Sequence, residues 1–147
     1  MQPITPDIIA RLSVNRWFGC LTRNALDLAL ETTDRAGKAV VYFDIDRLKA
    51  ANSTYGKEEV SRRIREVFAQ MRHDDIILGN WFSGDEFVAI VPMADAIGFA
   101  KRMQASLRQQ ALSATFLVWT HQDMDAAERL LTVIKDTWGI RDAIFVM

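Results

Sequence analysis

The stretch Phe82-Ser83-Gly84-Asp85-Glu86-Phe87 places two adjacent carboxylates directly after a Ser-Gly pair. Apolar runs stand on both sides, at 76–78 and 87–91. Ser-Gly is typical of turns and the flanking runs are typical of strands, so the stretch predicts the tip of a β-hairpin. A hairpin tip would push Asp85 and Glu86 into solvent at one edge of a sheet. Two crowded carboxylates repel each other unless a cation lies between them, which indicates a divalent metal site.

A second stretch, residues 39–49, supplies a further carboxylate. Its apolar beginning predicts a buried strand, and Asp44 comes where that strand ends. Carboxylates gathered at strand ends are the hard oxygen ligands that Mg²⁺ prefers. Asp44 and Asp85 would hold one or two metal ions, and two would suit in-line phosphoryl transfer. Lys49 follows shortly after Asp44 and could meet a phosphate as a point charge.

Length and composition predict one domain in the cytoplasm. The chain has 147 residues, half of them hydrophobic, which is enough to bury a core. A net charge of −1 argues against binding a nucleic acid polymer. The single Cys20 cannot form an internal disulfide, which favours a reducing compartment. No apolar stretch is long enough to span a membrane, and the N-terminus lacks the pattern of a signal peptide.

The apolar pattern alternates between helical and extended periods. It predicts an N-terminal helical segment within residues 1–18, with a short amphipathic helix at about 6–18, followed by a domain at 19–147. In that domain we expect helices at 23–33, 57–71, 95–110 and from 125 onward, and strands at 39–44, 76–78, 87–91, 114–119 and 142–147. Helices alternating with strands around one hairpin predict an α+β layered domain with a mainly antiparallel sheet and a ferredoxin-like core.

Two motifs resemble those of GGDEF domains, the diguanylate cyclases. Residues 44–52, Asp-Ile-Asp-Arg-Leu-Lys-Ala-Ala-Asn, look like the D-[LI]-D-x-F-K-x-[IVL]-N signature of that family. Residues 83–87, Ser-Gly-Asp-Glu-Phe, look like its namesake loop, with Ser in place of the first Gly. The order and the spacing of the motifs agree with the family over roughly residues 22–147. The resemblance implies a palm-like fold and synthesis of cyclic di-GMP from two GTP with Mg²⁺ or Mn²⁺.

The resemblance also implies roles for individual residues. The metals would be bound by Asp44, the Ile45 carbonyl and Asp85, and catalysis would rest on Lys49, Asp85 and Glu86. The nucleotide would contact the residues Asn52, Ser61, Ser83, Gly84, Lys135 and Arg141. A product-inhibition site would use Arg72 and Asp75, although two extra residues separate them from the loop compared with the family pattern.

The chain departs from the family at several of these positions. Ser61 stands where the family has a guanine-reading Asp, a feature of members that also accept ATP and make cyclic GMP-AMP. The arginine that usually precedes the loop is absent, and the spacing around Lys135 and Arg141 is stretched. The residues also have plain structural interpretations. Asp44 and Asn52 could cap turns, Asp85 and Glu86 could be solvated hairpin charges, and Lys49 could be a surface lysine.

The leading hypothesis is a cyclase that joins two GTP in a homodimer, because each 3′-hydroxyl must attack the nucleotide held by the other protomer. The alternative is a degenerate domain that binds a nucleotide or a protein partner without catalysis. The sequence shows no sensory module. A cyclase would therefore need control by a sensory or regulatory protein, or the chain is a fragment of a longer protein.

Overall fold

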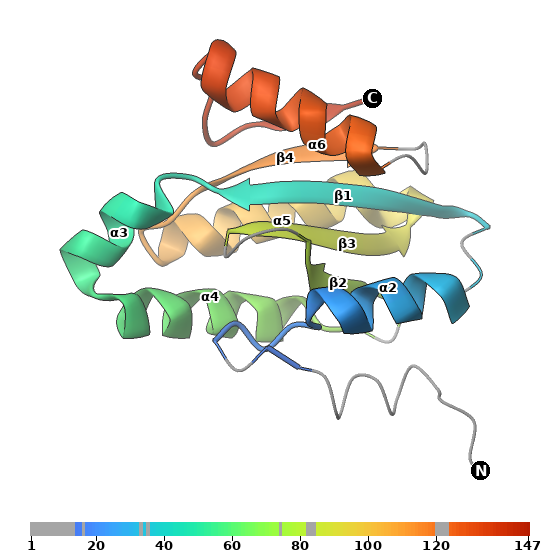
Figure 1. The fold of residues 1–147 in the computed structure, drawn as a ribbon, viewed down its shortest axis with the longest axis horizontal. Coiled ribbons are helices and arrows are strands. Elements are labelled where there is room, and N and C mark those ends of the chain that lie inside the picture. Colours follow the sequence, from blue (N-terminus) through green and yellow to red (C-terminus); the bar gives the residue numbers. More distant parts are fainter. Residues whose placement is uncertain are drawn as a thin grey trace.

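The computed structural model describes residues 14–15, 17–32, 34, 36–73, 75–81, 85–119 and 124–147. Within them a five-stranded sheet lies between two layers of helices (Figure 1). Its strands are β1 (Lys38–Ile45), β2 (Ile77–Asn80), β3 (Glu86–Pro92), β4 (Ala114–Trp119) and β5 (Ile144–Val146), in the order β2-β3-β1-β4-β5. β4 and β5 are parallel, and the other neighbouring pairs are antiparallel. The predicted α+β class is confirmed.

Two apolar cores lie on opposite faces of the sheet, because successive side chains of a strand point to opposite sides. On one face α4 (Lys57–Met71) and α5 (Ala96–Gln109) pack over Phe43, Phe87 and Phe116. On the other face α2 (Arg23–Thr32) and α6 (Met124–Thr132) pack over Tyr42, Val88 and Leu117. The central strand β1 is therefore buried on both sides, as its continuous apolar run predicts.

The remaining elements are short. A helix α3 (Leu48–Tyr55) follows β1, a 3₁₀ turn η1 (Met93–Asp95) precedes α5, and a π-helical turn η2 (Val133–Thr137) continues α6. No described helix has both the length and the apolar character that crossing a membrane requires.

Several predicted bounds agree with the structure. α4 and β4 begin and end where the sequence pattern places them. Thr22 caps α2, because its Oγ1 accepts a hydrogen bond of 3.3 Å from the Ala25 amide. Helix α3 was not predicted. None of its residues is buried, so its sequence carries no apolar stripe that would reveal a helix.

The predicted helix at 6–18 is wrong in its described part. Val14 forms an isolated bridge with Leu21, and Trp17 and Phe18 lie in a turn. The Asn15 side chain closes this turn, since its Oδ1 accepts a hydrogen bond of 2.8 Å from the Trp17 amide. The rest of that prediction lies outside the described residues.

Candidate functional site

Asp44 and Glu86 occupy directly opposed positions on neighbouring strands. Asp44 is the penultimate residue of β1, and it pairs with Glu86, the first residue of β3. Both continue the sheet face that α2 and α6 cover, two residues beyond Tyr42 and Val88 along their strands. Like charges at opposed positions destabilise a sheet unless something neutralises them. This strand end therefore favours a cation or a proton.

Both carboxyl groups have a raised pKa. Burial raises the pKa of Asp44 to about 6, although the Lys135 ammonium acts in the opposite direction. Burial raises the pKa of Glu86 to about 7, and the negative charges of Glu128 and Asp44 add to the effect. The Tyr42 hydroxyl beside Glu86 acts in the opposite direction and lowers its pKa. Two carboxyl groups that both favour the neutral form mark a position that a cation would stabilise.

The expectation that Asp85 and Glu86 project into solvent is wrong. Glu86 is already part of β3 and lies beside Asp44, and both Asp85 and Glu86 are only partly exposed. The Glu86 carbonyl is also held, since it accepts hydrogen bonds from the Trp81 amide at 2.9 Å and the Asn80 side chain at 3.0 Å. β3 thus begins to pair with β1 at Glu86, earlier in the chain than the turn signal suggests. Ser83 and Gly84 lie outside the described residues.

Asp85 lies beside the end of β1. The Ile45 amide donates a hydrogen bond of 3.0 Å to the Asp85 carbonyl. The three groups expected to bind metal, Asp44, the Ile45 carbonyl and Asp85, therefore come from two adjoining stretches of backbone. All three offer oxygen, the donor that Mg²⁺ prefers, so the donor set fits that ion. In this conformation, however, no three His, Cys, Asp or Glu side chains of the described residues form a group that could hold a metal ion.

Lys135 lies buried at the same strand end. Only 8% of the residue is exposed, and its Nζ is 3.1 Å from Oδ1 of Asp44 and 3.2 Å from Oδ1 of Asp46. η2 continues α6 and places this lysine at the end of β1. Sequence reasoning placed Lys135 on the nucleotide. The structure shows it paired with the carboxylate that we expect to bind metal.

Asp46 is a residue that sequence reasoning missed. Its carboxylate accepts hydrogen bonds of 2.8 Å from Ser113 Oγ, Thr115 Oγ1 and the Asp142 amide. It thus joins the end of β1 to β4 and to the segment before β5. The sequence signal that could have identified Asp46 is its place as the second aspartate of the Asp-Ile-Asp motif.

Arg141 lies behind Lys135 and fixes its backbone. Its Nη1 donates hydrogen bonds of 2.7 Å to the Lys135 carbonyl and 3.1 Å to the Ile140 carbonyl. Its Nε atom is buried and has no hydrogen-bond partner. A buried donor without a partner is compatible with an anion, so contact with a phosphate stays a prediction for Arg141.

Trp81 connects the two helices that cover the site face. Its Nε1 donates a hydrogen bond of 2.8 Å to Glu128 on α6. The Arg23 guanidinium of α2 lies 3.6 Å from the centre of the Trp81 ring and donates a hydrogen bond of 2.7 Å to the Trp81 carbonyl. Trp81, Arg23 and Glu128 were not predicted, because no local motif links residues that meet only through the fold.

The other predicted nucleotide contacts come from α3 and α4. Lys49 is exposed on α3, and Asn52 is half-buried on the same helix with an Oδ1 atom that accepts no hydrogen bond. Ser61 lies in α4 and is only 3% exposed. Gly56 joins the two helices with φ 89°, a conformation that glycine adopts without strain. The contacts of Lys49, Asn52 and Ser61 do not test the roles predicted for them, which stay predictions.

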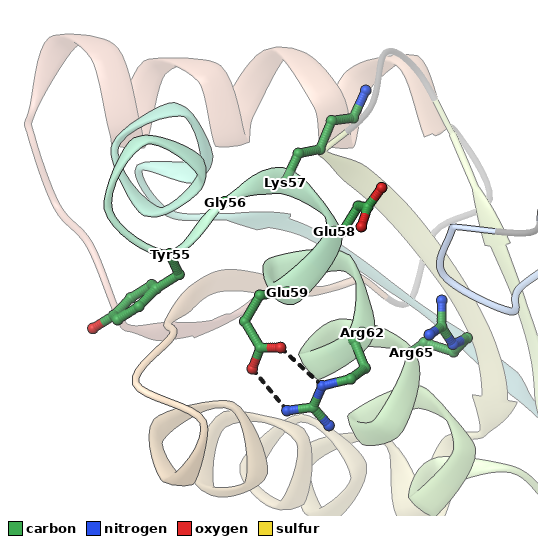
Figure 2. A pocket seen from close by; sticks show the side chains of 7 residues that line it. All are labelled: Tyr55, Gly56, Lys57, Glu58, Glu59, Arg62 and Arg65. Atoms are coloured by element: carbon green, nitrogen blue, oxygen red, sulfur yellow. Dashed lines mark hydrogen bonds and ion pairs between the residues drawn. The ribbon is translucent and has the colours of Figure 1, made fainter.

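A surface pocket opens beside the start of α4 (Figure 2). Glu59 and Arg62 pair across it through hydrogen bonds of 2.8 and 3.0 Å, while Tyr55 points away from them. The pocket is lined by Tyr55, Gly56, Lys57, Glu58, Glu59, Arg62 and Arg65. None of the predicted site residues is among them.

The two residues expected at an inhibitory site line a second pocket, which also contains His73, Asp95 and Arg102. Both Arg72 and Asp75 are exposed, and Arg72 donates a hydrogen bond to the Gly19 carbonyl. The fold thus brings Arg72 and Asp75 to one hollow in spite of their altered distance from the loop. Whether a ligand binds there stays a prediction.

Comparison by sequence finds no relative, since no protein-family profile and no curated protein match the chain. Comparison by structure finds many GGDEF domains. The diguanylate cyclase SiaD of Pseudomonas aeruginosa, solved with its activator SiaC, has a TM-score of 0.65 and 19% identity, covering 91% of this chain and 61% of SiaD. The chain therefore spans less than two thirds of SiaD.

Two further structures match over most of their own length. The GGDEF domain of DgcB from Caulobacter crescentus, in complex with c-di-GMP, has a TM-score of 0.65 and 19% identity, covering 91% of this chain and 92% of that one. A microbial GGDEF domain that interacts with cyclic di-GMP has a TM-score of 0.67 and 17% identity, covering 94% and 98%. The order and layering of the described elements agree with these domains: this chain has the GGDEF fold.

Proposed function

We propose that the protein is a nucleotidyltransferase of the diguanylate cyclase type, which joins two GTP into cyclic di-GMP in a homodimer, with one pyrophosphate leaving from each GTP. The observation that carries the proposal is the partly buried pair of opposed carboxylates at Asp44 and Glu86, with the Lys135 ammonium beside Asp44. A structural sheet gains nothing from like charges at opposed positions, whereas a site for a cation and an anionic substrate needs both signs of charge together.

Each residue of the site then has a task. Asp44, the Ile45 carbonyl and Asp85 would hold Mg²⁺ or Mn²⁺, which supplies charge neutralisation at the reacting phosphate. Glu86, with its pKa of about 7, can accept the proton of the attacking 3′-hydroxyl near neutral pH. Lys49 would stabilise charge on the phosphates.

The remaining contacts hold the nucleotide in place. Asn52 and Ser61 would contact the base, and Ser83 and Gly84 would lie against the phosphates, where Gly84 allows close approach. Lys135 and Arg141 would bind the triphosphate. Each protomer would hold one nucleotide, so two facing protomers are needed to close the ring. The cyclic di-GMP bound by DgcB supports this choice of product, and the SiaC activator of SiaD supports control by a partner protein.

A domain that binds nucleotide without catalysis is the second candidate. It is favoured by the ion pair between Lys135 and Asp44, which already neutralises the carboxylate expected to bind metal. A third possibility is synthesis of cyclic GMP-AMP, which would follow if Ser61 accepts adenine as well as guanine.

The deciding experiment incubates the protein with Mg²⁺ and GTP, ATP or both, followed by mass analysis of the products. We expect cyclic di-GMP from GTP. The variant Asp85→Ala should lose more than about 99% of the activity, because removal of a metal ligand disables the transition state. The control Asp125→Ala changes an exposed aspartate on α6 and should keep its activity.

The outcomes separate the candidates. A mixed product from GTP and ATP would identify the third possibility. Tight GTP binding with no product would favour the non-catalytic domain. Full activity in Asp85→Ala would remove Asp85 from the metal site.

A further inference from the structure

Lys135 has an unusual position for a lysine. Its ammonium is buried at the end of β1 and contacts two carboxylates at nearly equal distances, 3.1 Å for Asp44 and 3.2 Å for Asp46. Lysine is almost never fully buried unless it is paired, so these two contacts are what keeps the charge inside the protein.

The two carboxylates hold Lys135 unequally. Asp46 is 5% exposed and is fixed by hydrogen bonds from Ser113, Thr115 and the Asp142 amide. Oδ1 of Asp44, in contrast, is buried and has no hydrogen-bond partner besides the Lys135 ammonium, 3.1 Å away. Asp46 is therefore a permanent anchor, while Asp44 is the partner that can be exchanged.

The backbone around Lys135 is held in place, so only the side chain has to move. Lys135 lies in the π-helical turn η2, a type of turn that is rare and occurs frequently at functional sites. Its carbonyl accepts a hydrogen bond of 2.7 Å from Arg141, and the Trp138 amide closes the turn on the Val133 carbonyl at 3.1 Å.

A metal ion at Asp44 and the Lys135 ammonium in its present position exclude each other. Both would neutralise the same carboxylate, and positive charges only a few ångströms apart repel strongly where water is excluded. A triphosphate changes this balance, because it offers the ammonium another anion. Lys135 can then leave Asp44 while it stays beside Asp46.

We infer that Lys135 is an internal counter-ion that occupies the cation position at Asp44 in the free protein and exchanges Asp44 for the triphosphate when a metal–nucleotide complex binds. The inference rests on the proposed function, since it takes Asp44 as a metal ligand. It goes further by predicting that free metal binds poorly and that metal and nucleotide enter together. Lys135 thus offsets part of the negative charge of Asp44 and Asp46 in the empty site.

The test measures the affinity for free Mn²⁺ without nucleotide, by electron paramagnetic resonance of the unbound ion. The variant Lys135→Gln should bind free Mn²⁺ about tenfold more tightly than the wild type, because the competing cation is gone. It should bind a complex of Mn²⁺ and a non-cleavable GTP analogue more weakly. The variant Lys135→Arg keeps the charge and should retain the low affinity for free Mn²⁺. The control Lys101→Gln removes an exposed lysine on α5 and should behave as the wild type.

A loss of folding in Lys135→Gln would still give a result, since Mn²⁺ should restore the folded state by replacing the ammonium. Free Mn²⁺ affinity equal to or below the wild type in a folded Lys135→Gln, or failure of millimolar Mn²⁺ to rescue an unfolded one, would overturn the inference. The product assay on the wild type reports separately on the proposed function. An active wild type with an unchanged Lys135→Gln affinity removes the counter-ion role alone, and an inactive wild type with the expected gain removes catalysis alone.

Discussion

Glu86 begins β3 opposite Asp44, and the folded protein favours its protonated form. Its pKa rises from 4.5 to about 7 through burial and the neighbouring acidic groups. Since the folded pKa lies above the unfolded one, the associated stability is fully present below pH 4.5 and is lost as the pH rises through about 7. Above that range the charged carboxylate weakens the fold.

We therefore expect Glu86→Gln to gain stability over the wild type as the pH rises. Allowing for partial solvent screening, the gain should grow by about 1 kcal/mol between pH 5 and pH 8, or about 2–4 °C in melting temperature. Thermal unfolding at both pH values, without metal, measures it. The control Glu31→Gln changes an exposed residue of α2 and should show no such trend. If Glu86→Gln gains the same stability at pH 5 and at pH 8, the charged Glu86 carboxylate does not destabilise the fold.

At the level of single residues, the sequence identified the charged groups better than their surroundings. Asp44, Asp85 and Glu86 could be predicted because a short motif names them. The pairing of Lys135 with Asp44 could not, because the two residues lie far apart in the chain and meet only through the fold. The contacts of Trp81 with α2 and α6 could not be predicted for the same reason.

The elements show how closely α2 approaches the edge strand β2. A Cβ atom added to Gly79 would lie 2.9 Å from Leu26 Cβ and 3.0 Å from Leu26 Cδ1. Leu26 is fully buried, so it has no free space into which to move. The contact also positions the segment that follows β2, which carries Trp81 to the site.

Gly79→Ala should therefore destabilise the protein by roughly 1–3 kcal/mol through overpacking. Chemical denaturation measures the loss. Gly98→Ala is a control of opposite sign, because Gly98 lies within α5 and its added Cβ would meet the flexible end of Arg102. That variant should gain up to about 1 kcal/mol from helix propensity. Equal stability of Gly79→Ala and the wild type would show that α2 can shift away from β2.

Elements with strong apolar patterns could be predicted, and the others could not. α4 places Val60, Ile64 and Val67 on one buried face, which makes its bounds readable. α3 has no buried residue, and it is joined through Gly56 to α4, which packs beside it. Its sequence alone therefore does not predict a helix. The prediction that Glu86 projects into solvent was wrong, because a turn signal does not show at which residue the next strand begins to pair.

For the whole molecule, one protomer supplies one pair of opposed carboxylates, and ring closure between two nucleotides needs two such sites facing each other. The proposed reaction therefore depends on a second copy of the chain.

Specific activity should rise with protein concentration while the dimer is weak. In the range where monomers dominate, a tenfold increase in concentration should raise specific activity roughly tenfold by mass action. Initial rates across a dilution series, together with sedimentation at the same concentrations, test this. Constant specific activity in a protein shown to be monomeric would rule out the two-site reaction.

The central place of β1 in the sheet has a consequence for synthesis on the ribosome. β1 occupies residues 38–45, yet its neighbours β3 and β4 begin only at residues 86 and 114. At a translation rate of about 5–20 residues per second, β1 waits roughly 4–14 s for its last partner. Until β3 is made its apolar run is unpaired, and until β4 is made one edge of β1 stays open to other nascent chains. Chaperone shielding of the first half of the chain should therefore matter more for the yield of folded protein than the stability of the finished fold.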